Sequence, residues 1–313
     1  MAQLSLLQVD AGSNARVPVH LSRPSTRPTA AVILCHHGLG IYQDDFQRRY
    51  ADSLAQLGFL VALPDFYHRT WPVTKVASTK GAGLSQKDLP VVDLITRVSD
   101  EQLVADATAV VEYLEAKEGI TSIGVAGFCL GGRTAWLLAC AMPDKIKACN
   151  MCHGGNITIP LQGTRLCFCK LMLAHIFGRG AVCCPHGKAR SPLDRCSALR
   201  CPVMAHVGAA DNNPSPAEAE LLRASLAKCG NSDMVVHVYD GAKHGFCCGD
   251  SDSYQQAAAD LAWQRTASFL LKALTPGKKC DIPAAPGKSK QTGAECTSAC
   301  AEIAKKDAAV RST

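Results

Sequence analysis

A cysteine lies between glycines at residues 127–132, in the stretch Gly-Phe-Cys-Leu-Gly-Gly. The stretch follows an apolar run and precedes a helix-like one, which is the setting of the turn that exposes a nucleophile at the end of a strand. On such a turn, small neighbours relieve crowding, and the N-terminus of the following helix favours a thiolate. Cys129 is therefore a candidate nucleophile. The alternative is a buried cysteine in a glycine-rich turn.

A cysteine nucleophile needs a general base, and the base needs an acid that orients it. Asp211 follows the apolar run 201–208, and His244 follows the apolar run 233–240. In α/β-hydrolase folds the nucleophile, the acid and the histidine come in this order, each just beyond a strand. Either residue alone is equally well explained as an ordinary loop residue. The three in order favour a Cys129–His244–Asp211 triad.

Acyl transfer by such a triad also requires two donors for the developing oxyanion. The backbone N–H of Leu130 directly follows the candidate nucleophile and supplies one donor. The second is expected from the loop after the apolar run 31–35, where Gly38 lets the backbone approach a substrate closely. The alternative for Gly38 is a simple glycine-rich turn.

The elements that position these residues alternate between short apolar runs and amphipathic runs. Ser99 and Gln102 form a capping box, and Pro216 begins another helix. The predicted strands are 31–35, 59–64, 122–127, 145–152, 201–208 and 233–240, and the predicted helices are 44–58, 99–117, 131–142, 215–230 and 253–274. This alternation predicts an α/β fold with a mostly parallel central sheet and helices on both faces.

The predicted domain is single and spans residues 1–274. Residues 65–99 are rich in Gly, Pro, Ser and Thr and are expected to form a long loop. Residues 161–190 are cysteine-rich without a clear period and are expected to be an atypical insertion. Residues 275–313 are rich in Pro, Gly, Lys and Ser and are expected to form a disordered tail.

Composition excludes several function classes. The net charge is +6, much of the excess lies in the C-terminal tail, and no basic run is interleaved with aromatics, so nucleic-acid binding is not expected. No apolar run reaches the roughly 18 residues that span a membrane. The N-terminus lacks the basic and apolar regions of a signal peptide, so a cytoplasmic location is expected. The 17 cysteines are then expected to be free thiols, mostly small buried hydrophobes.

The sequence resembles the dienelactone hydrolase family, whose members are carboxymethylenebutenolidase-like α/β-hydrolases. The stretches that carry the resemblance are HHGLG (36–40), LPDFYHR (63–69), SDEQLVAD (99–106), GFCLGG (127–132), SPLDR (191–195), VGAADNNPSPAEAELL (207–222) and YDGAKHGF (239–246). The resemblance implies a Cys129–His244–Asp211 triad, oxyanion donors at Gly38 and Leu130, and hydrolysis of a small ester or lactone. This chemistry requires neither a cofactor nor a metal.

The sequence departs from the family at the substrate site. The best-known branch carries a glutamate in the first loop that helps to switch the thiol on, and His37 stands at that position here. Three arginines are available for the substrate carboxylate, namely Arg69, Arg97 and Arg133, and Arg69 ends a matching stretch. His37 and Arg69 are therefore candidate substrate-binding residues. Of the histidines near predicted strand ends, one is expected to line the pocket: His36, His37, His68 or His153.

Two other readings stay open, and the sequence leaves the oligomeric state open as well. One is a hydrolase fold that has lost catalysis and acts as a binding protein. The other is a metal-binding protein, although its candidate ligands show C-x-C and C-C spacing rather than paired C-x-x-C. Those candidates are Cys167, Cys169, Cys183, Cys184, His186, Cys196 and Cys201.

Overall fold

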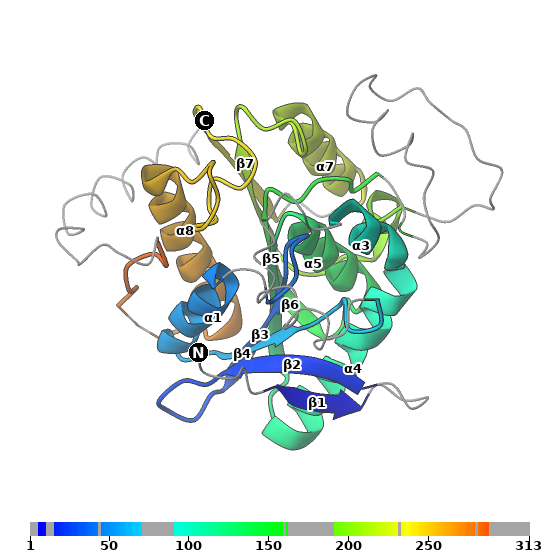
Figure 1. Ribbon diagram of the computed structural model, residues 1–313, viewed down its shortest axis with the longest axis vertical. Helices are drawn as coiled ribbons and strands as arrows, with labels where there is room; N and C mark the ends of the chain where they lie inside the picture. Colours follow the sequence, from blue (N-terminus) through cyan, green and yellow to red (C-terminus); the bar gives the residue numbers. More distant parts are fainter. Residues whose placement is uncertain are drawn as a thin grey trace, which may run out of the picture.

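One eight-stranded sheet forms the centre of the protein (Figure 1). The computed structural model describes residues 6–10, 16–42, 45–70, 91–158, 161, 191–230, 233–278 and 281–287. In this part of the chain the strand order is β1-β2-β4-β3-β5-β6-β7-β8, and all neighbours from β4 to β8 are parallel. The strands are β1 (Leu7–Asp10), β2 (Arg16–Ser22), β3 (Ala30–Cys35), β4 (Leu60–Pro64), β5 (Ser122–Phe128), β6 (Ile146–Cys152), β7 (Val203–Gly208) and β8 (Met234–Tyr239). The predicted mostly parallel sheet is confirmed.

Helices cover both faces of this sheet, as predicted (Figure 1). One face carries α1 (Phe46–Gln56) and α8 (Gln256–Leu274). The other face carries α3 (Val91–Arg97), α4 (Asp100–Glu118), α5 (Leu130–Ala141), α7 (Pro216–Lys228) and the short 3₁₀ helix η2 (Leu193–Ala198). The two faces have separate hydrophobic cores, with the sheet between them.

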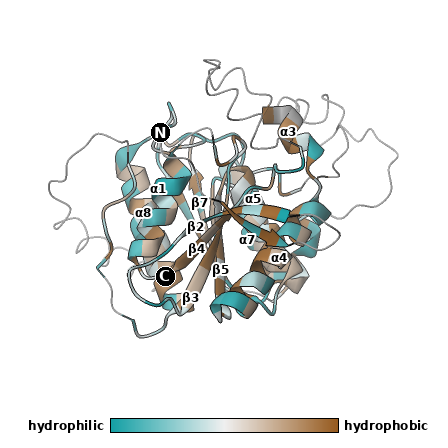
Figure 2. Ribbon diagram, turned by 60° about the horizontal axis from the view of Figure 1, so that its bottom comes forward, coloured by the Kyte–Doolittle hydropathy of each residue, from teal (hydrophilic) through white to brown (hydrophobic). Residues whose placement is uncertain are grey.

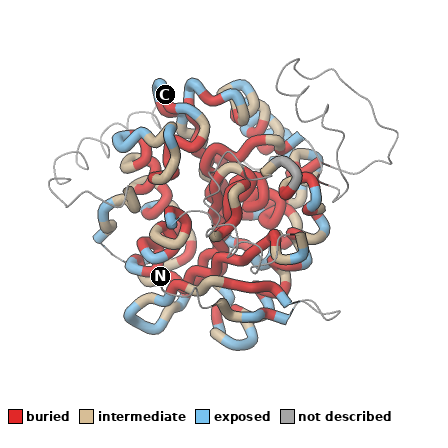
Figure 3. Tube along the Cα trace, in the orientation of Figure 1, coloured by how far each residue is buried: buried red, intermediate tan, exposed pale blue. Residues whose placement is uncertain are grey.

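Strand β3 shows why the central strands of the sheet have continuous apolar sequences. Ala31, Ile33 and Cys35 pack under α4 and α5, while the intervening residues pack under α1 and α8. Every residue of β3 is fully buried. A strand with helices on both faces has no solvent side and therefore no polar alternation. Figure 2 shows the apolar central strands, and Figure 3 shows the buried trace of the sheet.

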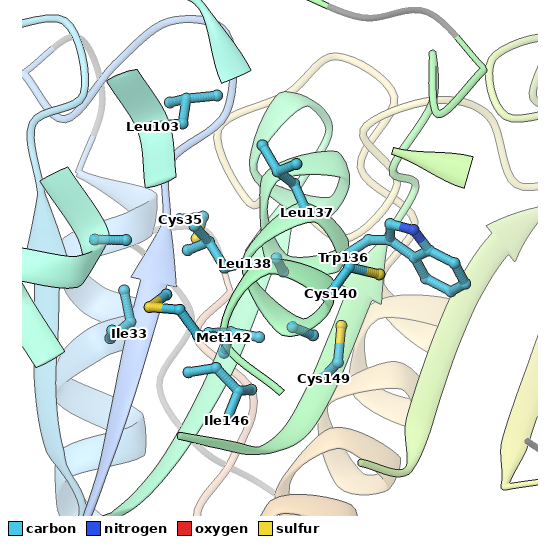
Figure 4. Close-up of a cluster of buried hydrophobic side chains, with 14 of the residues drawn as sticks. Ile33, Cys35, Leu103, Trp136, Leu137, Leu138, Cys140, Met142, Ile146 and Cys149 are labelled. Carbon is cyan, nitrogen blue, oxygen red and sulfur yellow. The ribbon is translucent and has the colours of Figure 1, made fainter. Parts of the chain in front are cut away.

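Most cysteines that the structure describes are core residues. Eight of these ten free cysteines are buried. Figure 4 shows Cys35 of β3, Cys140 of α5 and Cys149 of β6 within one cluster of buried hydrophobic side chains. Burial raises the pKa of each of these three thiols above its usual range, so they stay protonated and behave as small hydrophobes. For the described residues, this confirms the expected role of the cysteines.

Two helix starts follow the predicted capping chemistry. The Ser99 side chain accepts from the Gln102 N–H, and the Gln102 side chain accepts from the Ser99 N–H. Helix α7 begins with Pro216 after Ser215, which forms a second capping box with Glu218. These local bonds satisfy N–H groups that the first helical turn leaves free.

Two parts of the fold differ from the prediction. The sequence analysis predicted no strand before residue 31, whereas β1 and β2 form an antiparallel pair that joins the sheet at β4. Pro18 lies within β2, and a proline argues against a strand that is paired on both sides. The long loop predicted for residues 65–99 was partly wrong, because Val91–Arg97 forms α3. That helix has seven residues and is too short to show a clear apolar period.

Two predicted segments lie largely outside the described residues. Of the predicted insertion 161–190, only Leu161 is described. Of the predicted tail 275–313, residues 275–278 and 281–287 are described, and the Trp263 indole donates to the Pro283 carbonyl over 2.7 Å. No helix among the described residues is long and apolar enough to cross a membrane. The cytoplasmic location stays a prediction.

Candidate active site

Cys129 stands on a tight turn between β5 and α5. Its backbone has φ 55° and ψ −119°, a conformation that side-chain-bearing residues rarely adopt. A Cβ on Gly127 would lie 2.3 Å from the Gly131 oxygen, and a Cβ on Gly131 would lie 2.0 Å from the Cys35 oxygen. Both positions therefore require glycine, which explains the spacing Gly-x-Cys-x-Gly that the sequence shows.

Cys129 opens into a cleft of about 590 Å³. The cleft lies at the carboxyl edge of the parallel strands, where β3, β5, β6 and β8 end. In the described part of the chain it is lined by His37, Gly38, Leu39, Val91, Cys129, His153, His244, Gly245, Cys248, Asp250 and Ser251. The strand ends thus bring together residues that are more than 200 positions apart in the sequence.

His244 and Asp211 form a hydrogen-bonded pair beside Cys129. The two residues follow β8 and β7, and His244 Nδ1 lies 3.1 Å from Asp211 Oδ2. The other carboxylate oxygen of Asp211 accepts from the Asn213 N–H over 2.8 Å. The Asp211 side chain is 1% exposed, whereas that of His244 is 41% exposed. A buried, fixed carboxylate thus holds one ring nitrogen of a histidine whose ring reaches the cleft.

Cys129 and His244, which both line the cleft, shift each other's pKa. Burial acts to raise the pKa of the Cys129 thiol, but the charge and hydrogen bond of His244, assisted by His37 and the Leu130 N–H, lower it below its usual value. Burial acts to lower the pKa of His244, but Cys129 and Asp211 raise it to about 10. The arrangement therefore favours a thiolate–imidazolium pair at neutral pH.

Of the two predicted oxyanion donors, Leu130 adjoins the thiol and Gly38 lines the same cleft. The N–H of Leu130, the first residue of α5, contacts the Cys129 sulfur. Gly38 lines the same cleft, and its carbonyl accepts from the buried Tyr67 hydroxyl over 3.0 Å. A Cβ on Gly38 would lie 3.0 Å from the Val91 side chain. The absence of a side chain at Gly38 keeps this loop close to the opening of the cleft.

Two of the four histidines near strand ends line the cleft, namely His37 and His153. The His37 backbone N–H donates to Gln47, and its Nδ1 accepts from the Leu39 N–H over 3.2 Å. His36 instead points into the core, where its ring bonds the backbone of His37 and Phe66. The loop conformation is thus fixed by His36, while the His37 ring remains at the cleft.

His153 is a buried neutral base directly behind the nucleophile. Its Nδ1 accepts from the Cys129 N–H over 3.1 Å, and its Nε2 lies 3.7 Å from the Cys248 sulfur. An Nδ1 that accepts carries no proton, so the proton of the neutral ring is on Nε2. Burial, together with His244 and His37, holds the pKa of His153 well below its usual range. His153 therefore stays uncharged although its ring centroid is 4.8 Å from that of the His244 ring.

Arg69 and Arg133 have carboxylate partners away from the cleft. Arg69 donates to Asp106 over 2.6 Å and is not among the described residues that line the cleft. Arg133 forms a bidentate pair with Asp100, and both side chains are 1% exposed. This pair joins α5 to the start of α4 within the core. The structure therefore brings His37 to the candidate site but not Arg69.

Three polar residues of the cleft were missed by the sequence analysis: Cys248, Asp250 and Ser251. They follow His244 within seven positions, in a loop of successive turns such as Cys248 N–H to the Gly245 carbonyl and Ser251 N–H to the Cys248 carbonyl. Asp250 accepts from Arg49 over 2.8 Å, which ties this loop to α1. The only signal in the sequence was closeness to His244, because the run Cys-Cys-Gly-Asp-Ser carries no helical or strand period.

The metal-binding reading depends mainly on residues that lie outside the described part of the chain. Five of its seven candidate ligands lie outside them, and Cys196 and Cys201 are the two that are described. Among the described residues, no group of three or more His, Cys, Asp or Glu side chains could hold a metal ion.

Comparison with known proteins gives consistent similarities. The sequence model of the dienelactone hydrolase family matches residues 17–274. A protein of Escherichia coli O157:H7 named "putative carboxymethylenebutenolidase" is 27% identical over 256 residues, covering 80% of each chain. A carboxymethylenebutenolidase of Rhodococcus opacus is 28% identical over 237 residues, covering 74% of this chain and 77% of its own.

Solved structures show the same fold. The crystal structure of a "putative dienelactone hydrolase" from Klebsiella pneumoniae superposes with a TM-score of 0.66 at 22% identity. The match covers 86% of this chain and 98% of the other. The predicted α/β-hydrolase fold is thereby confirmed.

Proposed function

The chain belongs to the dienelactone hydrolase family, and on this premise we propose that it hydrolyses small esters or lactones with Cys129 as nucleophile. His244 is the general base and acid, and Asp211 orients its ring. The observation that carries the proposal is the position of Cys129, on a strained turn facing a cleft and beside a histidine that is bound to a buried carboxylate and lowers the pKa of the thiol. Each part is what nucleophilic catalysis by a thiol requires.

In the acylation half, the Cys129 thiolate attacks the carbonyl carbon and a C–S bond forms. The carbonyl π electrons move to oxygen, and the oxyanion accepts hydrogen bonds from the N–H groups of Leu130 and Gly38. When the carbonyl re-forms, the C–O bond to the alkoxide breaks and His244 gives its proton to the leaving oxygen. A thioester and an alcohol result.

In the deacylation half, the now neutral His244 takes a proton from water. The water oxygen attacks the thioester carbonyl through the same oxyanion site. The C–S bond then breaks, the carboxylic acid leaves and the thiolate pairs again with the imidazolium. Asp211 holds Nδ1 of the ring throughout and stabilises its charged form. Esters and lactones suit this scheme better than amides, because an alkoxide leaves more readily than an amine.

The cleft favours acyl groups that carry no carboxylate. Among the described residues that line it, none is a lysine or an arginine, and Asp250 adds a carboxylate. Arg69 and Arg133 are held by Asp106 and Asp100. A substrate carboxylate would lie near the Cys129 thiolate and Asp250, and the described cations beside them, His244 and Arg49, already have these anions as partners.

We expect kcat/KM for 4-nitrophenyl butyrate to exceed that for mono-4-nitrophenyl succinate by about tenfold or more. The two esters share a leaving group and have acyl chains of similar length. Because the succinate carboxylate also attacks its own ester, the rate without enzyme is subtracted for each substrate. Initial rates at pH 7 in low and high salt measure the difference. An equal or higher value for the succinate would contradict this substrate class.

The direct test of the mechanism is to trap the thioester. The protein is mixed with 4-nitrophenyl acetate, quenched in acid and digested with trypsin. Cleavage after Lys117 and Arg133 gives the peptide 118–133, in which Cys129 is the single cysteine. We expect one acetyl group on this peptide, and we expect its removal by hydroxylamine, which cleaves thioesters.

The matched control for this trap is the peptide 229–243, which also carries one cysteine, the exposed Cys229. Under the same brief exposure it is expected to remain unmodified. Turnover without an acetyl group on 118–133, or equal acetylation of both peptides, would contradict Cys129 as the nucleophile.

A further inference from the structure

Two cysteine sulfurs approach each other far from the cleft. Cys196 lies on η2, and Cys229 caps the C-terminal end of α7. Their Sγ atoms are 3.0 Å apart, although the residues are 33 positions apart in the sequence. An S–S bond of about 2.05 Å requires only a small further approach of the two side chains.

The surroundings of the pair give the two thiols different accessibility. Cys229 is exposed to solvent, whereas Cys196 is 9% exposed and packs into the core beneath η2. Burial and the neighbouring Cys229 raise the pKa of Cys196 to about 11. A reagent in solution therefore meets Cys229 first, and Cys196 is held behind it as the second thiol.

The Cys196–Cys229 pair lies at the end of the sheet where the parallel strands begin, and the cleft lies at the end where they finish. Cys196 precedes β7 and Cys229 precedes β8, so both lie where these parallel strands begin. Cys129 and His244 lie where parallel strands end. Chemistry at the pair is therefore spatially separate from the proposed ester hydrolysis.

We propose that Cys196 and Cys229 are a reversible disulfide site, closed by a low-molecular-weight disulfide and reopened by a thiol. In the first step the Cys229 thiolate attacks one sulfur of the reagent, whose S–S bond breaks and releases one thiolate. In the second step the Cys196 thiolate attacks the Cys229 sulfur of this mixed disulfide, and the second reagent thiolate leaves. Two protein thiols are oxidised and one reagent disulfide is reduced to two thiols.

The bridge would enclose residues 196–229, the segment that contains β7, Asp211 and all of α7. Closing this loop lowers the conformational entropy of the unfolded chain. In the folded protein it fixes η2, which packs against both α5 and α7. We expect the oxidised protein to melt about 5 °C higher than the reduced protein.

The sequence allows the bridge to be mapped without ambiguity. Trypsin cleavage after Arg195, Arg200, Lys228 and Lys243 places each cysteine on its own peptide, 196–200 and 229–243, with no other cysteine. The nearby Cys201 falls on a third peptide, 201–223. Wild-type protein is incubated with glutathione disulfide at pH 8, alkylated, digested and analysed by mass spectrometry. We expect the linked species 196–200 with 229–243, and its loss on treatment with dithiothreitol.

Two variants complete the test. Cys229→Ser changes an exposed residue, and it should lose both the linked species and the rise in Tm. Cys196→Ala should stop at the mixed disulfide of Cys229 with glutathione. A wild-type protein that also stops at this mixed disulfide, or that links Cys229 to peptide 201–223, would overturn the proposal. The readout does not depend on ester hydrolysis and so stands apart from the proposed function.

Discussion

Replacing Cys129 with alanine is expected to lower kcat/KM for 4-nitrophenyl acetate by about 10⁴-fold, a loss typical of removing the nucleophile of a triad. Alanine keeps the Cβ that the turn accommodates at φ 55°. Gly127 and Gly131, which make this turn possible, are unchanged. The folded structure should therefore survive, and the rate loss reports chemistry. Initial rates at pH 7 and the melting temperature measure the two effects separately.

The matched control is Cys229→Ser, which removes an exposed thiol at the opposite edge of the sheet. It is expected to retain the wild-type rate within about twofold. If Cys129→Ala retained more than about a tenth of the wild-type rate while folded, the thioester mechanism would be wrong. A water molecule activated by His244, or the second thiol of the cleft, Cys248, would then be the better candidate nucleophile.

The candidate site could be predicted where its signals are local or follow from strand order. The turn at Cys129 could be predicted because it leaves no room for a side chain at positions 127 and 131, and the sequence has glycine at both. The pairing of Asp211 with His244 could be predicted because each follows a parallel strand. Parallel strands end on the same side of a sheet, so loops far apart in the sequence become neighbours. The mostly parallel sheet was predictable for a similar reason, since buried strands read as continuous apolar runs.

What could not be predicted depends on long-range partners. Nothing near Arg69 in the sequence shows that Asp106, 37 positions away, holds its guanidinium. The same is true of Arg133 and Asp100. The contact of His153 with the Cys129 N–H needs the close approach of two turns, which only the packed sheet provides. Strand β1 has only four residues, and β2 contains Pro18, so the pairing of these two strands depends on their neighbours rather than on their own sequence pattern.

His244→Gln is expected to lower kcat/KM by about 10³-fold or more, and also to change which step is slow. His244 is the group that lowers the pKa of Cys129 against the opposing effect of burial. Without it, burial raises the pKa of the thiol above its usual value, so little thiolate is present at pH 7. Alkylation of Cys129 by iodoacetamide at pH 7, read on peptide 118–133, should slow by at least about tenfold.

The variant should also separate the two halves of the reaction. Raising the pH restores the thiolate and hence acylation, but no base remains to activate water for deacylation. At pH 9 or above, His244→Gln should therefore accumulate the acetyl group on Cys129 and release one burst of nitrophenol. His20→Gln makes the same change on β2, outside the lining of the cleft, and should behave as wild type. Steady turnover by His244→Gln without acetyl accumulation would assign deacylation to another base. The neutral His153, which accepts from the Cys129 N–H, would then be a candidate.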